Sequence, residues 1–468
     1  MEGLHTYHAL LASGQALLAE VQSEDIELDE NNNPKPIEYE INGTSGSIKI
    51  NHGDGTIDSY TLNATISHTY TKANAPYRII ITGDLKNITA ILRLPRFNIK
   101  GLVFTPNAKN LSGRFNNWFG DIKYLKYTKD VERIVFSYTN LEGDISVFSQ
   151  TNGKIGNNIV NHRFKKSQVY GNIDNFQYLH PDIQELVYNK TNVTGIPKKL
   201  LTLSNLSNIT ALPFSNTLIS GFTGDINTNI QQSSIKEYSI SYTSADLDTS
   251  LFEQSPFSDL ELIRCRNLNS ITGNSDFLSN TPNLEILWID INIELSKLSN
   301  CEGLIKEIIV NSVSGSLNVF GNYSFANLSR IHAGNSTCTD DVGNLDLPSL
   351  DRLQIKNSSA NGTLKFSNNI ILKSIILDNN AISGFDKANS NFNLGNLTDF
   401  TLNNNALTQT AIEDIAAYLN DANLNQPGSN NTYTLDVAGA GNAIATSAAQ
   451  TDLDNIANTY GWTVFYNS

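Results

Sequence analysis

The chain has 468 residues, of which 40% are hydrophobic and 17% are charged, and its formal net charge at pH 7 is −14. An acidic chain without a basic stripe does not suit nucleic acid, because nucleic-acid-binding proteins displace phosphate counterions with Lys and Arg. No apolar run reaches the length of about 18 residues that a membrane-spanning helix needs, so none is predicted.

Residues 1–36 are predicted to form an N-terminal helix or arm followed by an acidic linker. The start, MEGLHTYHALLASGQALLAEV, has no basic residue before its apolar part, and Ser13, Gly14 and Gln15 interrupt that part, so we expect no secretory signal. Helical spacing of apolar residues predicts an amphipathic helix carrying Leu4, Tyr7, Leu11 and Leu18. This helix would either fold over the first repeats or dock as an arm into another protein. The following SEDIELDENNNPKP is expected to be a solvated linker.

Residues 37–83 are predicted to form a small β segment. Half-buried strands are indicated by alternating apolar residues, at Ile48 and Ile50 and again at Tyr77, Ile79 and Ile81. The tripeptide Gly53-Asp54-Gly55 is typical of a tight turn between strands.

This segment resembles the polycystic-kidney-disease-type (PKD) β-domain, whose signature is a Gly-Asp-Gly turn, then His-Thr-Tyr, then Tyr-x-Val-x-Val. The later positions are filled here by His68-Thr69-Tyr70 and Tyr77-x-Ile79-x-Ile81. The family's aromatic residue before the turn is replaced by His52, and the segment is short, so the resemblance implies a truncated N-terminal cap. Asp54 is interpreted as a structural turn carboxylate rather than a calcium ligand, and no metal site is predicted.

Residues 84–405 repeat the pattern Leu-x-x-Leu-x-Leu-x-x-Asn-x-Leu, with any aliphatic residue accepted as Leu. The full pattern is present at Leu397, Phe400, Leu402, Asn405 and Leu407, and LKSIILDNNAISGF from 372 to 385 supplies another Asn, Asn380. Copies starting at 328 and 350 have Ser in place of Asn, and copies at 131, 183 and 235 have Thr. The starts at 235, 260, 284, 305, 328, 350, 372 and 397 lie 21 to 25 residues apart. This period resembles that of leucine-rich repeats, about 20–29 residues.

The resemblance implies an α/β solenoid with a parallel β-sheet, a small N-terminal β (PKD-like) cap and a C-terminal α/β cap. Each short strand would turn alternate side chains inward, and the chain would then bend and bury backbone groups. An Asn amide offers two donors and an acceptor, so stacked Asn residues would form a ladder along one flank, with Ser and Thr as weaker versions.

Residues 406–468 are predicted to be the C-terminal capping region. Thr410-x-x-Glu413 and Ser447-x-x-Gln450 have the spacing of capping boxes that open two helices, and Gly461 has the position of a helix C-terminal cap. One strand is predicted around Tyr433, Leu435 and Val437, and a closing strand over 462–466. The whole arrangement, over residues 39–468, resembles leucine-rich-repeat proteins of Bacteroidota surfaces and of phages infecting those bacteria.

The sequence predicts neither an enzyme nor a cofactor site. Its seven His include no His-Glu-x-x-His pair, and scattered carboxylates offer no identifiable acid–base pair. The three Cys, at 265, 301 and 338, have spacings unlike a metal motif, and Cys265 and Cys338 fall at inward repeat positions, so buried free thiols are expected. Gly439-Ala-Gly441 lacks the Lys-Ser/Thr of a phosphate loop.

A binding surface is predicted on the concave side of the solenoid, because outward strand positions of a repeat array form one long surface. Trp288 combines an aromatic anchor with charged neighbours, as interface hot spots do. The predicted surface consists of Arg264, Arg266, Trp288, Asp290, Ile309, His332, Lys356 and Ile376, in which Ile309 and Ile376 are expected to expose apolar area.

The expected function is that of a non-enzymatic virion protein, a tail- or head-associated phage fibre or decoration that presents the repeats for protein or glycan binding. It would be assembled in the host cytoplasm, would contact other virion proteins through the N-terminal arm, and would be part of an oligomeric assembly. The alternative is a bacterial cell-surface adhesin whose signal peptide has been removed.

Overall fold

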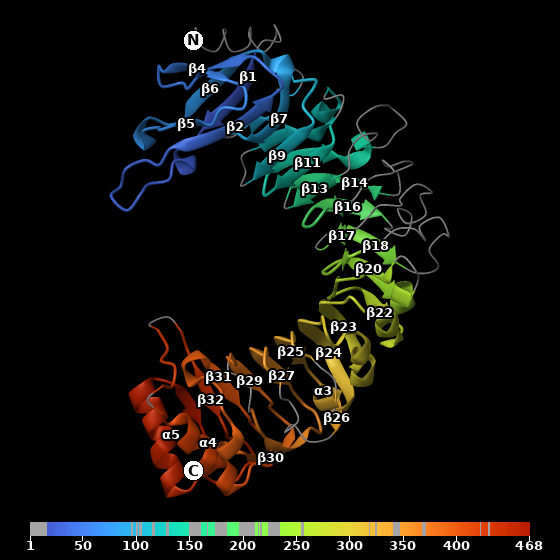
Figure 1. The fold of residues 1–468 in the computed structure, drawn as a ribbon, viewed down its shortest axis with the longest axis vertical. Coiled ribbons are helices and arrows are strands. Elements are labelled where there is room, and N and C mark those ends of the chain that lie inside the picture. The colour runs from blue at the N-terminus through green and yellow to red at the C-terminus, as the bar shows by residue number, and fades with distance from the viewer. Residues whose placement is uncertain are drawn as a thin grey trace. The chain divides into compact units, whose positions relative to one another are not determined.

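The computed structural model of the chain describes residues 16–94, 97–99, 102, 105–114, 118–127, 131–148, 161–165, 167–173, 185–195, 211–213, 215, 218–222, 235–253, 257–317, 319–322, 325–339, 347–366, 371–421, 423–428 and 431–468. The chain divides into two compact units (Figure 1). The first comprises Met1–Ile235, Ser239–Leu247 and Leu268–Ser270, and the second comprises Lys236–Tyr238, Asp248–Asn267 and Ile271–Ser468.

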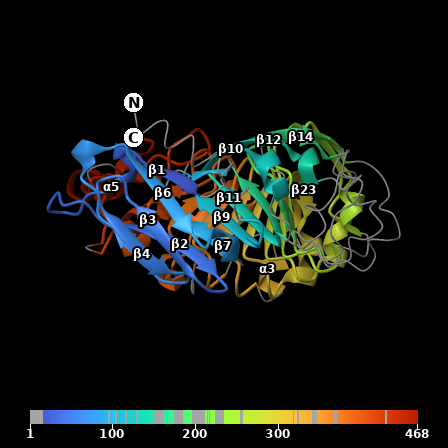
Figure 2. The same ribbon diagram turned by 90° about the horizontal axis from the view of Figure 1, so that it is seen from above.

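The first unit begins with a module of six strands: β1 (Leu17–Val21), β2 (Ile37–Gly43), β3 (Ser47–Asn51), β4 (Ile57–Thr61), β5 (Ile66–His68) and β6 (Tyr77–Gly83). Antiparallel pairing gives the order β1-β6-β3-β4, which lie side by side in Figure 2, while β2 pairs with β5 and with β7 (Ile88–Arg93). The expected alternation in β3 and β6 is present, because Ile48, Ile50, Tyr77, Ile79 and Ile81 are all buried.

The helix predicted near the N-terminus is wrong for its last residues, because Leu17–Val21 is strand β1. Leu17 pairs with Ile81 of β6, and Ala19 pairs with Phe97 of β8 (Phe97–Asn98). Leu17, Ala19 and Val21 are buried, so the period of two that a strand needs was present beside the helical spacing. The other predicted helix positions, Leu4, Tyr7 and Leu11, lie outside the described residues.

Two rows of parallel strands make up the repeats of the first unit. One row runs from β7 (Ile88–Arg93) through β9 (Asn110–Arg114), β11 (Arg133–Ser137), β13 (Asn161–Lys165), β15 (Glu185–Val187) and β17 (Ala211–Pro213). The other consists of β8 (Phe97–Asn98), β10 (Trp118–Asp121), β12 (Asn140–Asp144), β14 (Gln168–Asn172), β16 (Asn192–Gly195), β18 (Leu218–Phe222) and β20 (Ser244–Asp248).

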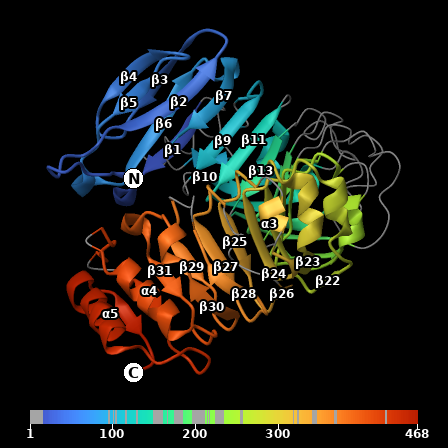
Figure 3. The same ribbon diagram turned by 60° about the horizontal axis from the view of Figure 1, so that its bottom comes forward.

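The second unit is built on one principal parallel sheet. Its strands are β19 (Glu237–Ser239), β21 (Leu262–Cys265), β23 (Ile286–Glu294), β24 (Glu307–Ser316), β25 (Arg330–Ala333), β27 (Arg352–Ile355), β29 (Ser374–Ile376), β31 (Asp399–Thr401), β32 (Thr434–Asp436) and β33 (Thr463–Phe465). Figure 3 shows β25, β27, β29 and β31 in chain order, with α4 at the β31 end of the row. The remaining elements are β22 (Ser270–Thr272), β26 (Thr337–Thr339), β28 (Asn361–Leu364), β30 (Ala381–Phe385) and α3 (Val319–Asn322).

The core of the second unit lies under this sheet. Alternate strand residues such as Ile263, Leu287 and Ile308 are fully buried, and so are Phe252 and Phe277 from 3-10 turns of the connecting segments, whose ring centroids lie 5.4 Å apart. Burying each such side chain contributes about 1.5–3 kcal/mol relative to leaving it exposed. Cys265, Cys301 and Cys338 are buried free thiols, as the repeat pattern predicts for the first and last of them.

Asparagines at the predicted position of the repeat bond to the backbone of two neighbouring turns. The amide nitrogen of Asn405 donates to the carbonyl of Leu377 at 2.8 Å, and its oxygen accepts from the backbone nitrogen of Ile382 at 3.1 Å. The amide nitrogen of Asn380 donates to the carbonyls of Ile355 and Leu377, each at 2.9 Å. The predicted ladder is therefore confirmed at both positions.

The Ser and Thr substitutes make fewer bonds, as their single hydroxyl implies. Thr191 and Thr243 donate to the carbonyls of Tyr188 and Ile240, at 2.7 and 2.8 Å. The hydroxyl of Thr139 has no hydrogen-bond partner among the described residues.

The C-terminal region contains α4 (Gln409–Leu419) and α5 (Ser447–Tyr460), and the closing strand follows Gly461, which caps α5 in the left-handed conformation at φ 75°. Both predicted helix starts are wrong by one or two residues. The N-cap of α4 is Thr408 rather than Thr410, and its side chain accepts from the backbone nitrogen of Ala411. The N-cap of α5 is Thr446 rather than Ser447.

Candidate functional site

The outward side chains of the second unit's principal sheet form regular rows. Strand registers place one residue of each strand in a single line: Arg264, Trp288, Ile309, His332, Gln354, Ile376 and Thr401. A second row consists of Arg266, Asp290 and Lys356, which lie two residues after Arg264, Trp288 and Gln354. We call the surface made by these rows the strand face. All eight residues of the predicted binding surface belong to it.

The most distinctive part of the strand face is a group that we call the Arg264–Trp288 cluster, made of Arg264, Trp288, Glu307 and Arg330. The Arg264 guanidinium carbon lies 4.5 Å from the centre of the Trp288 ring, within the range of a cation–π contact. The indole nitrogen of Trp288 donates to Glu307 Oε2 at 3.1 Å. Trp288 is partly buried, so these two contacts hold a ring that still meets solvent.

Each of the two arginines in this cluster has one buried nitrogen without a hydrogen bond. The Nε atoms of Arg264 and Arg330 are buried and have no hydrogen-bond partner among the described residues. A guanidinium nitrogen of Arg330 lies 3.8 Å from Glu307 Oε2, which is an ion pair at the long end of the range. One carboxylate, Glu307, therefore serves both the indole of Trp288 and the charge of Arg330.

Other charged residues of the face fix the turns that follow the strands. Arg266 Nε donates to Asp290 Oδ1 at 2.8 Å, and Asp290 Oδ2 accepts from the backbone nitrogen of Asn267 at 2.6 Å. Asn267 has a positive φ of 54°, so Asp290 stabilises a turn conformation that few residues adopt. Asp290 is thus a structural residue of the face as well as a charge on it.

Lys356, which follows β27, and Asp378, which follows β29, make a similar pair. Their side chains are 3.2 Å apart, and Asp378 Oδ1 accepts from the backbone nitrogen of Asn403 at 3.1 Å. Lys356 keeps about a third of its side chain exposed, so the pair is accessible to a partner.

His332 lies between cations on this face. Burial lowers its pKa below the usual value of 6.5, and the positive charges of Arg266, Lys356 and Arg330 lower it further. The imidazole is therefore neutral at pH 7 and available as one donor and one acceptor.

The apolar part of the site is smaller than expected. Ile309 is only 8% exposed, so the expectation that it exposes apolar area is wrong, because Trp288 and His332 flank it on the neighbouring strands. Ile376 is partly exposed.

Two residues of the site, Glu307 and Arg330, were not predicted from the sequence. The prediction considered only the middle residue of each strand and the residue two positions after it. Glu307 and Arg330 lie two positions before the middle residue of their strands, on the same face.

Comparison with known proteins identifies the fold. No protein-family model matches the sequence, and no curated protein matches it. Among solved structures, the ectodomain of the Arabidopsis receptor kinase HAESA in complex with an extended IDA peptide hormone has a TM-score of 0.52 at 18% identity, covering 66% of this chain and 56% of that one. The PEPR1–AtPEP1 structure gives a TM-score of 0.52 at 15% identity, covering 77% and 52%.

A structure of HAESA in complex with IDA and the co-receptor SERK1 has a TM-score of 0.51 at 16% identity, and the match covers 79% of this chain and 71% of that one. The match thus spans little more than half of the first two receptor chains. At these identities the likeness defines the fold. The chain therefore has the fold of a leucine-rich-repeat solenoid, as its parallel sheets, its repeat period and these structures agree. No helix among the described residues is long and apolar enough to cross a membrane.

Proposed function

We propose that this chain is a non-enzymatic binding protein whose strand face takes a protein partner, and that it serves as an attachment or decoration protein of a phage virion. The observation that carries the binding proposal is the Arg264–Trp288 cluster, which presents an aromatic ring and two guanidinium groups on a rigid sheet. Trp and Arg are the residues that most often dominate the energy of protein interfaces.

The cluster is organised before any partner arrives. Arg264 and Glu307 hold the Trp288 ring from its face and its nitrogen, so little rotamer entropy remains to be lost on binding. The Arg264 and Arg330 side chains are partly exposed, and their guanidinium groups suit carboxylates, because charge-assisted hydrogen bonds to Arg are the strong ones. The partner that fits places an apolar group on Trp288 and acidic or carbonyl oxygens toward the two arginines.

The dimensions of the strand face suit an extended segment. The line from Arg264 on β21 to Thr401 on β31 crosses seven strands, which at about 4.8 Å per spacing makes roughly 29 Å. About nine residues of extended chain cover that length. HAESA, whose fold is similar, is bound to a peptide hormone in its structure; this supports a peptide-like partner by fold analogy alone. A glycan stacked on Trp288 is the second ligand class.

The virion assignment rests on the resemblance of the N-terminal β segment, the repeats and the closing helix to phage proteins of Bacteroidota hosts. The same resemblance includes surface proteins of those bacteria, so a cell-surface adhesin is the alternative. Docking to other virion proteins through the N-terminal arm would fall to residues 1–15, which lie outside the described residues, since Leu17–Val21 is engaged in β1.

Immunogold labelling tests the location. An antibody raised against the repeats is applied to lysed cells and free particles of an expressing culture on one grid. We expect gold on the particles, and its position on head or tail separates decoration from attachment. Gold on cell envelopes alone would contradict the virion proposal and support the adhesin.

A further inference from the structure

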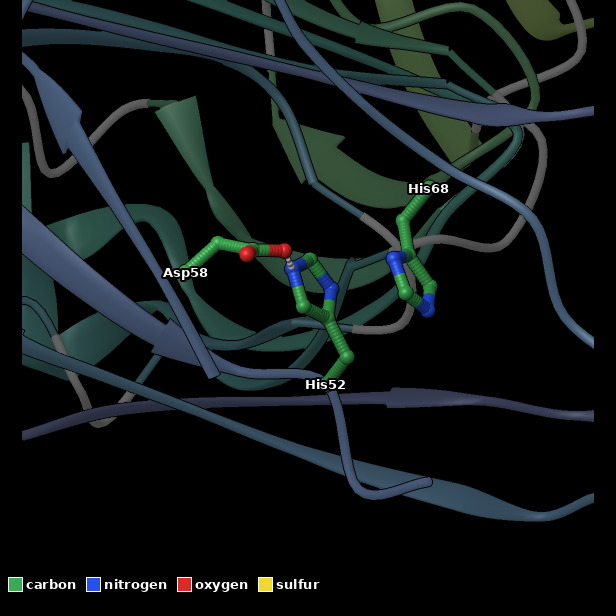
Figure 4. Close-up of side chains that lie close together, drawn as sticks. All are labelled: His52, Asp58 and His68. Atoms are coloured by element: carbon green, nitrogen blue, oxygen red, sulfur yellow. Dashed lines mark ion pairs between the residues drawn. The ribbon is translucent and has the colours of Figure 1, made fainter. Parts of the chain in front are cut away.

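Three side chains that can bind a metal ion lie close together in the N-terminal module, although they are separated in the sequence. His52 follows β3, Asp58 belongs to β4, and His68 ends β5 (Figure 4). One possible ligand atom from each of the three lies within 4.8 Å of the others. Strands β3 and β4 pair with each other, whereas β5 pairs with β2, so the group joins two different sheets.

The ring of His52 is oriented by a neighbour and keeps one nitrogen without a hydrogen bond. Its Nδ1 lies 3.1 Å from the hydroxyl of Tyr70, a buried contact that fixes the ring. Its Nε2 is buried, has no hydrogen-bond partner among the described residues, and lies 3.4 Å from Asp58 Oδ2. Buried polar groups normally have a partner, so a buried imidazole nitrogen next to a carboxylate is suited to bind a proton or a cation.

His68 is oriented in the same manner by a second carboxylate. Its Nε2 lies 2.7 Å from Asp54 Oδ2, which leaves Nδ1 as the nitrogen available for another partner. The rings of His52 and His68 are stacked, with centroids 3.8 Å apart and planes 9° apart. Figure 4 shows Asp58 and His68 on opposite sides of the His52 ring, with the dashed ion pair running from Asp58 to His52.

We propose that His52, Asp58 and His68 bind a divalent transition-metal ion of the zinc class. Two imidazole nitrogens and one carboxylate oxygen are three of the four ligands that such an ion takes, and water supplies the fourth. Calcium and magnesium are the wrong class, because they take oxygen ligands. Tyr70 and Asp54 have the place of outer residues that orient metal-binding histidines.

Side-chain rotation is needed to close the site. In tetrahedral geometry, two ligand atoms that each lie about 2.1 Å from one ion are about 3.4 Å apart, whereas the ligand atoms now lie within 4.8 Å of one another. The two imidazoles must splay from their stacked arrangement so that both lone pairs point to one ion. Metal binding would then tie β3 and β4 to β5 and stabilise the module from which the repeats continue.

The test is zinc binding by the tag-free full-length chain after treatment with a chelator. Titration calorimetry with zinc sulfate should give one site per chain, and zinc should raise the midpoint of thermal unfolding. Cobalt(II) should bind with the visible absorption of a tetrahedral site, while calcium and magnesium chloride should change nothing.

Two variants and a matched control decide whether these residues form the site. Asp58→Asn and His68→Gln replace side chains that are not fully buried, and each should weaken zinc binding at least tenfold and abolish the cobalt absorption. His332→Gln, in the second unit, removes a histidine from elsewhere and should leave both unchanged. Absence of zinc binding in the unaltered chain, or equal binding by all variants, would overturn the proposal. The outcome is independent of the function proposed for the strand face.

Discussion

At the scale of single residues, buried asparagines determine how each turn of the solenoid ends. Asn405 and Asn380 hold equivalent positions, but only Asn405 uses its amide oxygen, because the Asn380 oxygen has no partner among the described residues. The backbone nitrogen that the pattern assigns to it, that of Ala360, bonds instead to Ser358 in the same turn. A Ser in one repeat therefore costs the next Asn a hydrogen bond.

This difference predicts an order of stability. Asn405→Leu leaves the backbone nitrogen of Ile382 unpaired and removes one of the two amide donors to the carbonyl of Leu377, and should lower the free energy of unfolding by about 1–3 kcal/mol. Asn380→Leu should also destabilise, but by less. The measurement is the urea midpoint. The control is Asn361→Leu, an exposed residue with one long hydrogen bond, which should leave the midpoint in place. An unchanged midpoint for Asn405→Leu would reject the ladder.

His332 predicts a pH dependence of stability. Its folded pKa lies below the unfolded value of 6.5, so the unfolded chain binds more protons between the two values and stability falls as pH drops through that window. Above pH 7 the imidazole is neutral in both states and nothing is lost. His332→Gln should therefore lose less stability than the unaltered chain between pH 7.5 and 5.5, as measured by urea midpoints. Identical pH dependence in both proteins would exclude this role.

At the scale of elements, helix starts show what local patterns miss. The capping-box pattern selected Thr410 because a Glu stands three residues later, but Glu413 accepts instead from the hydroxyl of Thr446 at 2.6 Å. The chain leaves the preceding turn at Leu407, and Thr408 is the first residue whose extended backbone lets its hydroxyl reach the free nitrogens of α4. The end of the repeat, rather than the Glu, sets where the helix begins.

Threonine substitutions distinguish the two assignments. Thr408→Ala should lower the free energy of unfolding by about 1 kcal/mol, because the backbone nitrogen of Ala411 loses its acceptor. Thr410→Ala, inside the helix and exposed, should be neutral or slightly stabilising, since Ala is the better helix former. Denaturation in urea measures both. A larger loss for Thr410→Ala would restore the cap that the sequence pattern indicated.

The strands of the repeats could be predicted from the sequence, because the phased apolar positions report directly which side chains turn inward. Trp288 and Arg264 were predicted to be neighbours for the same reason, and they are paired in register. Strand β1 could not be predicted, because its partner β6 lies some sixty residues away and helical and strand periods both fit LLAEV. The meeting of His52 with His68 also depends on sheet pairing that no local pattern reports.

The asparagine at 442 illustrates a further limit. Its amide nitrogen donates to the carbonyls of Leu402, Val437 and Ala438, and its oxygen accepts from the backbone nitrogen of Leu407. It therefore continues the ladder into the C-terminal region. The repeat template missed it because the turn before it is two residues longer than in the other repeats.

At the scale of the whole molecule, the acidic net charge contrasts with a strand face on which cations and carboxylates are paired. The chain carries a net charge of −14, which repels other acidic molecules at long range. The strand face carries Arg264, Arg266, Arg330 and Lys356, and the last three of these pair with Asp290, Glu307 and Asp378. A partner must therefore reach this particular face to gain favourable contacts, and close complementarity matters more than net charge.

The most direct test of the central claim is whether removal of the Trp288 side chain abolishes binding to host cells. Purified, fluorescently labelled chain is added to host cells, and the bound amount is measured for the unaltered protein, Trp288→Ala and Phe465→Ala. Phe465 is an exposed aromatic residue on the same face, in register with Asp436 and roughly 34 Å from Trp288 at about 4.8 Å per strand. We predict that Trp288→Ala lowers binding at least tenfold while the chain still unfolds cooperatively in urea, and that Phe465→Ala binds normally. Full binding by Trp288→Ala, or an equal loss in both variants, would contradict the account.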